Sequence, residues 1–67
     1  MRLNQVQFED IECGDKVYSL NWKKEGRILR KRQDETYLYG AVKIVWSNGY
    51  IENVSLLVGN CVEVIQD

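Results

Sequence analysis

The sequence predicts an all-β protein, a small five-stranded barrel formed by one chain of 67 residues. Apolar and polar residues alternate over several short segments, which is the period of a half-buried strand. Glycine, asparagine and aspartate bound these segments, and such residues favour turns. No long segment shows apolar residues at the three-to-four-residue spacing of an amphipathic helix. Five short strands separated by turns favour a closed or nearly closed barrel.

The first three strands follow turn residues. We expect strands within GDKVYSLNW, residues 14–22, within GRILRKRQ, residues 26–33, and within TYLYGAVKIVW, residues 36–46. Gly40, inside the third strand, predicts a bend or bulge. The alternation of side chains in a strand divides the third one into two faces. These are Leu38, Val42, Ile44 and Trp46 on one face, and Tyr37, Tyr39, Ala41, Lys43 and Val45 on the other.

The segment WSNGYI, residues 46–51, is the clearest local signal of a hairpin. Asn48 and Gly49 fit a two-residue type I′ turn, because both of its central positions need a positive φ. That turn places Trp46 opposite Ile51, with both side chains toward the core.

The rest of the chain predicts one more strand and an N-terminal extension. YIENV continues through the tight segment SLLVGN, residues 55–60, into a last strand CVEVIQ, residues 61–66. We expect residues 1–12 to pack on a barrel of residues 13–67, as a strand or a single helical turn across one end. The predicted core comprises Val17, Leu20, Ile28, Val42, Ile44, Trp46, Ile51, Val54, Leu57, Val62 and Val64.

The pattern GDKVYSLNW, EGRI and VKIVWSNGYIENVSLL resembles that of Tudor-like barrels. These belong, with the KOW-type domains, to the Src-homology-three-like superfamily. The shared features are a Gly-Asp turn, an aromatic near the end of the first strand, a glycine before the second and an Asn-Gly hairpin. The resemblance covers roughly residues 13–65 and implies a small five-stranded barrel. Tudor-like domains typically bind methylated Lys or Arg, whereas KOW-type domains typically contact RNA or the transcription and translation machinery.

The aromatic cage of Tudor-like domains is matched only in part. Trp22 and Trp46 match two cage positions, while Leu29 stands where the second strand usually carries an aromatic residue. Tyr50 lies one residue from the fourth position. A cation gains most when several rings surround it, so the resemblance implies an incomplete cage. Recognition of methylated Lys or Arg is therefore one alternative function.

The composition argues against an enzyme and against a metal site. The chain has no histidine and two cysteines, Cys13 and Cys61. Structural zinc needs four Cys or His ligands, and the commonest general base near neutral pH is absent. The acids at residues 9–15 and 34–35 lack the spacing of a catalytic carboxylate pair or of a metal-binding loop. We expect a protein without cofactor, metal or small-molecule substrate, with reduced cysteines.

The apolar segments are too short for a membrane protein. None approaches the roughly 20 consecutive apolar residues of a membrane span. The first ten residues, MRLNQVQFED, lack the apolar stretch of a signal peptide. These features predict a cytoplasmic protein, either a monomer or a weak dimer, that does not associate with membranes.

Positive charge is concentrated in KKEGRILRKR, residues 23–32. Six cations and one acid give this segment a charge of +5, while the other 57 residues hold three cations and nine acids, −6 in total. In a regular strand Arg30 and Arg32 share one face, and Arg27 and Lys31 share the other. The candidate binding residues are Lys23, Lys24, Arg27, Arg30, Lys31 and Arg32, with the aromatics Trp22, Tyr39 and Tyr50.

These features predict a small non-enzymatic binding module. Clustered Lys and Arg side chains bind phosphates, and neighbouring aromatics stack unpaired bases. Nucleic-acid association, with single strands or structured RNA, is the leading interpretation. One alternative is a protein-docking adaptor or inhibitor, of the kind that bacteriophages make, that binds an acidic partner surface. The cations also suit a solvated edge strand, where they discourage aggregation.

Overall fold

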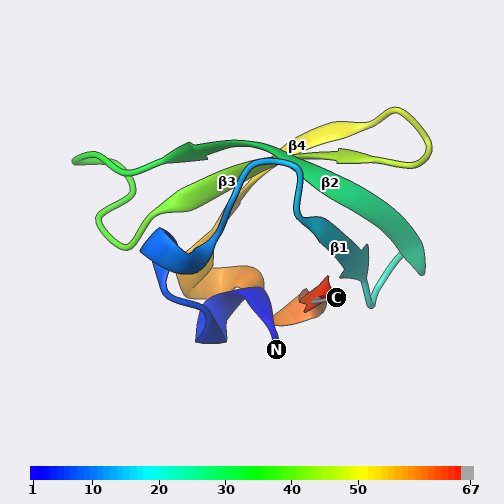
Figure 1. The fold of residues 1–67 in the computed structure, drawn as a ribbon, viewed down its shortest axis with the longest axis horizontal. Helices are drawn as coiled ribbons and strands as arrows, with labels where there is room; N and C mark the ends of the chain where they lie inside the picture. Colours follow the sequence, from blue (N-terminus) through cyan, green and yellow to red (C-terminus); the bar gives the residue numbers. More distant parts are fainter. Residues whose placement is uncertain (66–67) are drawn as a thin grey trace.

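A computed structural model describes residues 1–65. The chain forms one antiparallel five-stranded sheet in the order β4-β3-β2-β1-β5 (Figure 1). The mostly β fold and the number of strands are confirmed. The strands are β1 Lys16–Ser19, β2 Lys24–Arg32, β3 Ala41–Trp46, β4 Ile51–Ser55 and β5 Val62–Ile65. The three 3₁₀ helices are η1 Leu3–Gln5, η2 Phe8–Asp10 and η3 Leu56–Cys61.

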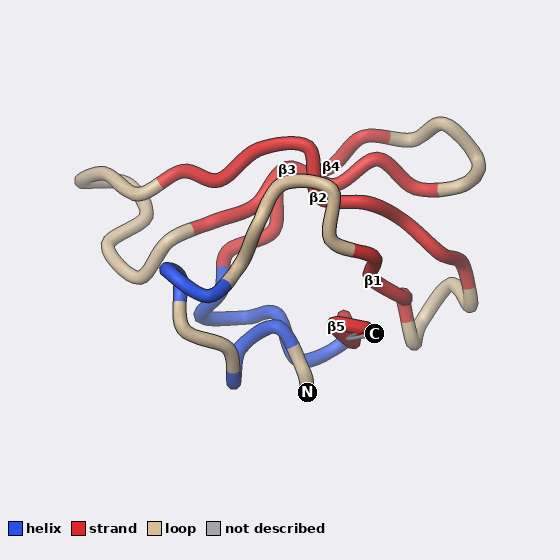
Figure 2. The backbone as a smooth tube through the Cα atoms, in the orientation of Figure 1, coloured by secondary structure: helices blue, strands red, loops and turns tan. Residues whose placement is uncertain are grey.

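The core lies between the inner face of the sheet and the 3₁₀ helices, which lie on one side of it (Figure 2). The N-terminal segment contributes two fully buried side chains, Leu3 and Ile11, to the same core as the strands. It is also held by main-chain contacts, since the N–H of Val64 donates to the carbonyl of Met1 at 2.8 Å. The buried apolar residues are Leu3, Ile11, Val17, Ile28, Ala41, Val42, Ile44, Trp46, Leu56, Val62 and Val64.

Three residues predicted in the core, Leu20, Ile51 and Leu57, are exposed instead. Leu20 lies in the turn after β1, where the alternation of the strand has ended. Leu57 lies in η3, where the preceding residue, Leu56, is buried. The hydroxyl oxygen of Ser55 accepts the N–H of Leu57 and caps this helix, so the strand alternation stops there.

The hairpin between β3 and β4 differs from the predicted type I′ turn. Gly49 has a φ of 87°, while Asn48 does not have a positive φ. The N–H of Gly49 donates to the carbonyl of Trp46 at 2.8 Å, and Val45 rather than Trp46 pairs with Ile51. A shift of one residue exchanges the two faces of a strand. This shift is why Ile51 lies on the outer face.

The predicted long strand over residues 36–46 is also wrong in its first half. The carboxylate of Asp34 accepts the backbone N–H groups of Thr36 and Tyr37 at 2.9 and 3.1 Å. This side chain folds the segment into a turn, as aspartate often does. Gly40, with a φ of 96°, ends the turn just before β3 and provides the predicted bend.

Both cysteines of the described residues 1–65, Cys13 and Cys61, are free thiols. Cys13 is exposed, and Cys61 is half-buried at the end of η3. In this part of the chain, none of the helices has the length and apolar character needed to cross a bilayer.

Candidate nucleic-acid interface

Strand β2 contains a β-bulge at Leu29. Ile28 pairs with Ile44 of β3, and the next paired residues are Arg30 and Lys43. Leu29 is therefore an extra residue without a partner on β3. Beyond a bulge, the alternation of faces resumes one residue later than in a regular strand.

The bulge changes which basic side chains share a face. The prediction that Arg27 and Lys31 share one face is wrong. Arg27, Arg30 and Arg32 are exposed on the outer face of the sheet. Lys31 is half-buried on the inner side, where its Nζ donates to the carbonyl of Phe8 at 3.0 Å and lies 4.6 Å from the ring centroid. The structure thus concentrates three arginines on one surface.

Lys43 joins these arginines, although it was not among the predicted binding residues. It lies directly opposite Arg30 in the β2–β3 pair. Arg30, Arg32, Lys43 and Asn53 line a hollow of about 130 Å³. Alternation along the strand predicts that Lys43 points away from the core. Its position opposite Arg30 follows only from the register between β2 and β3.

Acidic partners are scarce around this hollow. Within residues 1–65 Arg32 is the one outer-face arginine that forms an ion pair, between its Nε and the carboxylate of Asp34. Arg30 and Lys43 have no acidic partner in the same part of the chain. Like charges directly opposite each other destabilise an antiparallel pair. The face therefore carries positive charge that its own acids do not offset.

The contact between Arg32 and Asp34 shifts the pKa of both groups. The pKa of Asp34 is lowered, mainly because Arg32 donates a hydrogen bond to it and next because the N–H of Tyr37 does. The same hydrogen bond raises the pKa of Arg32. The Arg32 guanidinium also lies over the Tyr37 ring, 5.1 Å from its centroid. Asp34 is thus both a turn residue and a charge partner.

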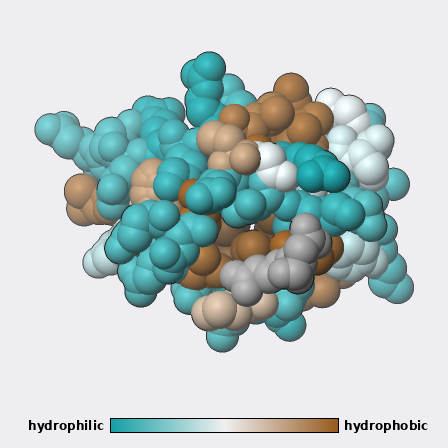
Figure 3. Space-filling view, viewed as in Figure 1, coloured by the Kyte–Doolittle hydropathy of each residue, from teal (hydrophilic) through white to brown (hydrophobic). Residues whose placement is uncertain are grey.

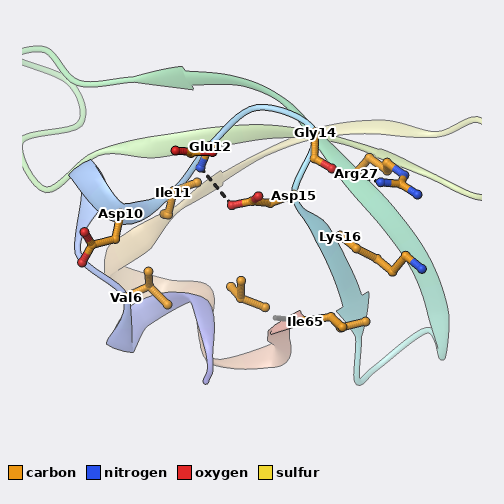
Figure 4. Close-up of a pocket in the computed structure, with 10 residues that line it drawn as sticks. Val6, Asp10, Ile11, Glu12, Gly14, Asp15, Lys16, Arg27 and Ile65 are labelled. Atoms are coloured by element: carbon orange, nitrogen blue, oxygen red, sulfur yellow. Dashed lines mark hydrogen bonds between the residues drawn. The ribbon is translucent and has the colours of Figure 1, made fainter. Parts of the chain in front are cut away.

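Arg27 has more local partners than Arg30. Its Nη1 donates to the carbonyl of Gly14 at 3.1 Å. Arg27 also lines a cavity of about 350 Å³, whose other lining residues include Lys16 and the carboxylates Asp10 and Asp15 (Figure 4). Because both signs of charge line this cavity, it favours an anion less than the hollow beside Arg30 does.

Trp22 packs against two other aromatic side chains at the end of the sheet formed by the β3–β4 hairpin. The Trp22 ring lies 5.5 Å from Tyr50 and 6.3 Å from Trp46, centroid to centroid. Trp46 is buried and its Nε1 donates to Glu52 at 2.9 Å. Trp22 and Tyr50 are 46% and 53% exposed. Rings at these separations pack against each other. The arrangement favours stacking on an exposed ring over enclosure of an ammonium group.

Lys23 and Lys24 lie beside this aromatic cluster, away from the outer-face hollow. Lys23 is exposed in the β1–β2 turn, with a φ of 56°, and its N–H donates to the carbonyl of Ser19 at 2.8 Å. Lys24 pairs with the buried Ser19 and is half-buried. The six predicted cations are therefore divided among the outer face, the inner side and this turn.

Comparison of the chain with protein-family models, curated proteins and solved structures finds no match. The Tudor-like resemblance therefore rests on the sequence pattern. What points to a function is the geometry of the basic face and of the exposed rings.

Tyr39 lies apart from the other two candidate aromatics. It precedes β3, whereas Trp22 and Tyr50 contact each other beyond the opposite end of that strand. Hydrophilic residues cover most of the surface in Figure 3, with apolar residues in separate patches between them. Tyr39 belongs to one group of exposed apolar side chains that line the same two hollows, which comprises Leu38, Tyr39 and Leu57.

Proposed function

We propose that this protein is a non-enzymatic module that binds single-stranded nucleic acid or structured RNA through the outer face of its sheet. The observation that carries the proposal is the position of Arg30 directly opposite Lys43. Two opposed cations destabilise the sheet. An anion bound between them removes this repulsion, so the arrangement suits a polyanionic ligand.

The chemistry of the neighbouring side chains supports a nucleic acid. Phosphates need clustered cations, and the guanidinium of arginine matches two phosphate oxygens at once. The exposed rings of Trp22 and Tyr50 offer surfaces on which unpaired bases can stack. The charge of −6 outside residues 23–32 opposes non-specific binding to double-stranded nucleic acid. We therefore propose single strands or folded RNA as the ligand.

The proposal includes the finer fold, a small barrel of the Tudor-like or KOW-type class. The strand order supports it, because the last strand, β5, returns to pair with the first, β1. The single buried face and the short 3₁₀ segment leading into β5 are further support. An experimental structure in which β4 and β5 do not close around the core would argue against the barrel.

Fluorescence anisotropy with short labelled RNA and DNA strands tests the binding function. If about four phosphates are neutralised, log K falls with log salt at a slope near −3 for single strands. The double variant Arg30→Gln, Lys43→Gln should make the slope shallower by about one to two units. The matched control, Lys23→Gln with Lys24→Gln, removes the same charge away from the outer face and should have a smaller effect. An absence of saturable binding at low salt overturns the proposal.

A second candidate function is docking of a protein partner at the end of the sheet where β3 begins, away from the β3–β4 hairpin. Exposed apolar groups with an aromatic residue are typical of protein interfaces. Glu9 and Glu35 line the hollows beside this group, so a partner with an apolar side chain next to a Lys or Arg fits it. The group consists of Leu38, Tyr39 and Leu57.

The docking candidate is tested by comparing captured proteins across variants. Tyr39→Ala should weaken capture of a genuine partner by more than about 1 kcal/mol, as loss of an anchor does. The outer-face variant Arg30→Gln, Lys43→Gln should retain that partner. Loss from both variants alike would exclude a separate docking site around Tyr39.

A further inference from the structure

The outer-face hollow is built by a row of side chains from three neighbouring strands. Arg30 of β2 pairs with Lys43 of β3, and Lys43 pairs with Asn53 of β4. Arg32 completes the lining. The hollow has a volume of about 130 Å³. This space is sufficient for a single tetrahedral oxyanion.

All four side chains that line this hollow can donate hydrogen bonds. Two guanidinium groups and an ammonium group only donate, and the Asn53 amide can donate without adding charge. Charge-assisted hydrogen bonds from such groups to phosphate oxygens are short and strong. Within residues 1–65, Asp34 is the one carboxylate that forms an ion pair with a lining residue, and it does so with Arg32.

The two oxygens of Asp34 have different roles. Oδ1 accepts the N–H groups of Thr36 and Tyr37 and shapes the turn after β2. Oδ2 accepts from Nε of Arg32. The turn contact and the ion pair can therefore be separated by substitution, because a neutral amide side chain keeps an oxygen acceptor for the turn but has no charge to hold Arg32.

We propose that Arg30, Arg32, Lys43 and Asn53 form a pocket for one phosphate group, and that Asp34 competes with this phosphate for Arg32. The inference rests on the proposed function and specifies which phosphate contact fixes the position of the nucleic acid on the sheet. A bound phosphate relieves the repulsion between Arg30 and Lys43. It gains the full hydrogen-bonding capacity of Arg32 only after displacing the Asp34 carboxylate.

Titration of ¹⁵N-labelled protein with inorganic phosphate tests the pocket directly. The amide shifts should concentrate at residues 30–32, 43 and 53. Lys43→Gln and Asn53→Ala should weaken binding of this probe, while Lys23→Gln should leave it nearly unchanged. Shifts concentrated at residues 23–24, or equal losses in all three variants, would overturn the pocket. Dispersed amide spectra confirm that each variant is folded.

The competition is tested with a pair of matched loop variants. Asp34→Asn keeps an Oδ1 acceptor for the turn and removes the charge that holds Arg32. Glu35→Gln makes the same change of charge one residue away, at a side chain with no ion pair to Arg32 in the described chain. Asp34→Asn should tighten binding of inorganic phosphate about twofold to fivefold, the range expected for an exposed ion pair. Equal tightening by both variants would overturn the role of Asp34.

The same variants separate this inference from the proposed function. If wild type and Lys43→Gln bind a labelled oligonucleotide equally well, the pocket is wrong while nucleic-acid binding stands. If inorganic phosphate occupies the pocket but no oligonucleotide binds, the pocket stands and the proposed function fails. Tighter oligonucleotide binding by Asp34→Asn than by Glu35→Gln supports both.

Discussion

Gly26 of β2 lies directly opposite Trp46 of β3. A Cβ atom placed on Gly26 would lie 2.6 Å from Cε3 of Trp46 and 2.9 Å from the backbone oxygen of Val45. Glycine within a strand often marks a close approach of another group. Here the missing side chain leaves space for the buried indole. The glycine near the start of the second strand is thus needed for packing of the core.

Gly26→Ala should therefore destabilise the protein by about 1–3 kcal/mol, the cost of forcing extra volume into a packed core. Urea unfolding followed by tryptophan fluorescence measures the change. Glu25→Ala, at the exposed neighbouring position, is the control and should stay within about 0.5 kcal/mol of wild type. Equal stabilities for the two variants would contradict the close packing.

The features that the sequence predicted well are set by local patterns. Val17, Ile28 and Ile44 are buried as expected, because alternation along a strand determines which side chains point inward. The turn residues likewise predicted where along the chain one strand is separated from the next. Burial of Leu3 and Ile11 depends instead on where a distant segment packs, and the first twelve residues carry no clear periodicity.

The candidate site was predicted less completely, because its geometry depends on pairing between strands. The bulge at Leu29 moves Arg27 to the face of Arg30, and no local signal in RILRKR marks it. Lys43 becomes part of the site only through this shifted register. The register of the β3–β4 hairpin could not be predicted from the sequence either, because Asn-Gly fits both two-residue and longer loops.

Substitutions of Gly49 should form a graded series. Its φ is 87° and a Cβ atom at this position would have nothing within 4 Å, so the cost is backbone strain alone. Gly49→Ala should cost about 1–2 kcal/mol, Gly49→Asn less and Gly49→Val more, because asparagine tolerates this conformation and β-branched residues do not. Thermal unfolding measures the series. A valine variant as stable as wild type would contradict the turn geometry.

The hydrogen bond from Nε1 of Trp46 to Glu52, 2.9 Å long and partly buried, should contribute to stability. Glu52→Ala leaves the indole N–H without this acceptor and should cost about 1–3 kcal/mol. Glu52→Gln retains an oxygen acceptor and should cost less. In a Trp46→Phe background Glu52→Ala should have little further effect, as a double-mutant cycle would show. Additive losses would mean that the two side chains act independently.

Acid titration should show the Asp34 contact with Arg32. Because the pKa of Asp34 is lowered on folding, its contribution to stability is present above the ordinary aspartate pKa. It is lost as the pH falls through the lower folded value. Carbon-13 NMR of the carboxyl group should give a pKa below that of an unfolded peptide. Arg32→Gln should raise this pKa, because the Arg32 hydrogen bond is its largest cause, and the Tyr37 N–H should keep part of the shift. Arg30→Gln should change it much less, and an equal rise in both variants would indicate a general field rather than a specific pair.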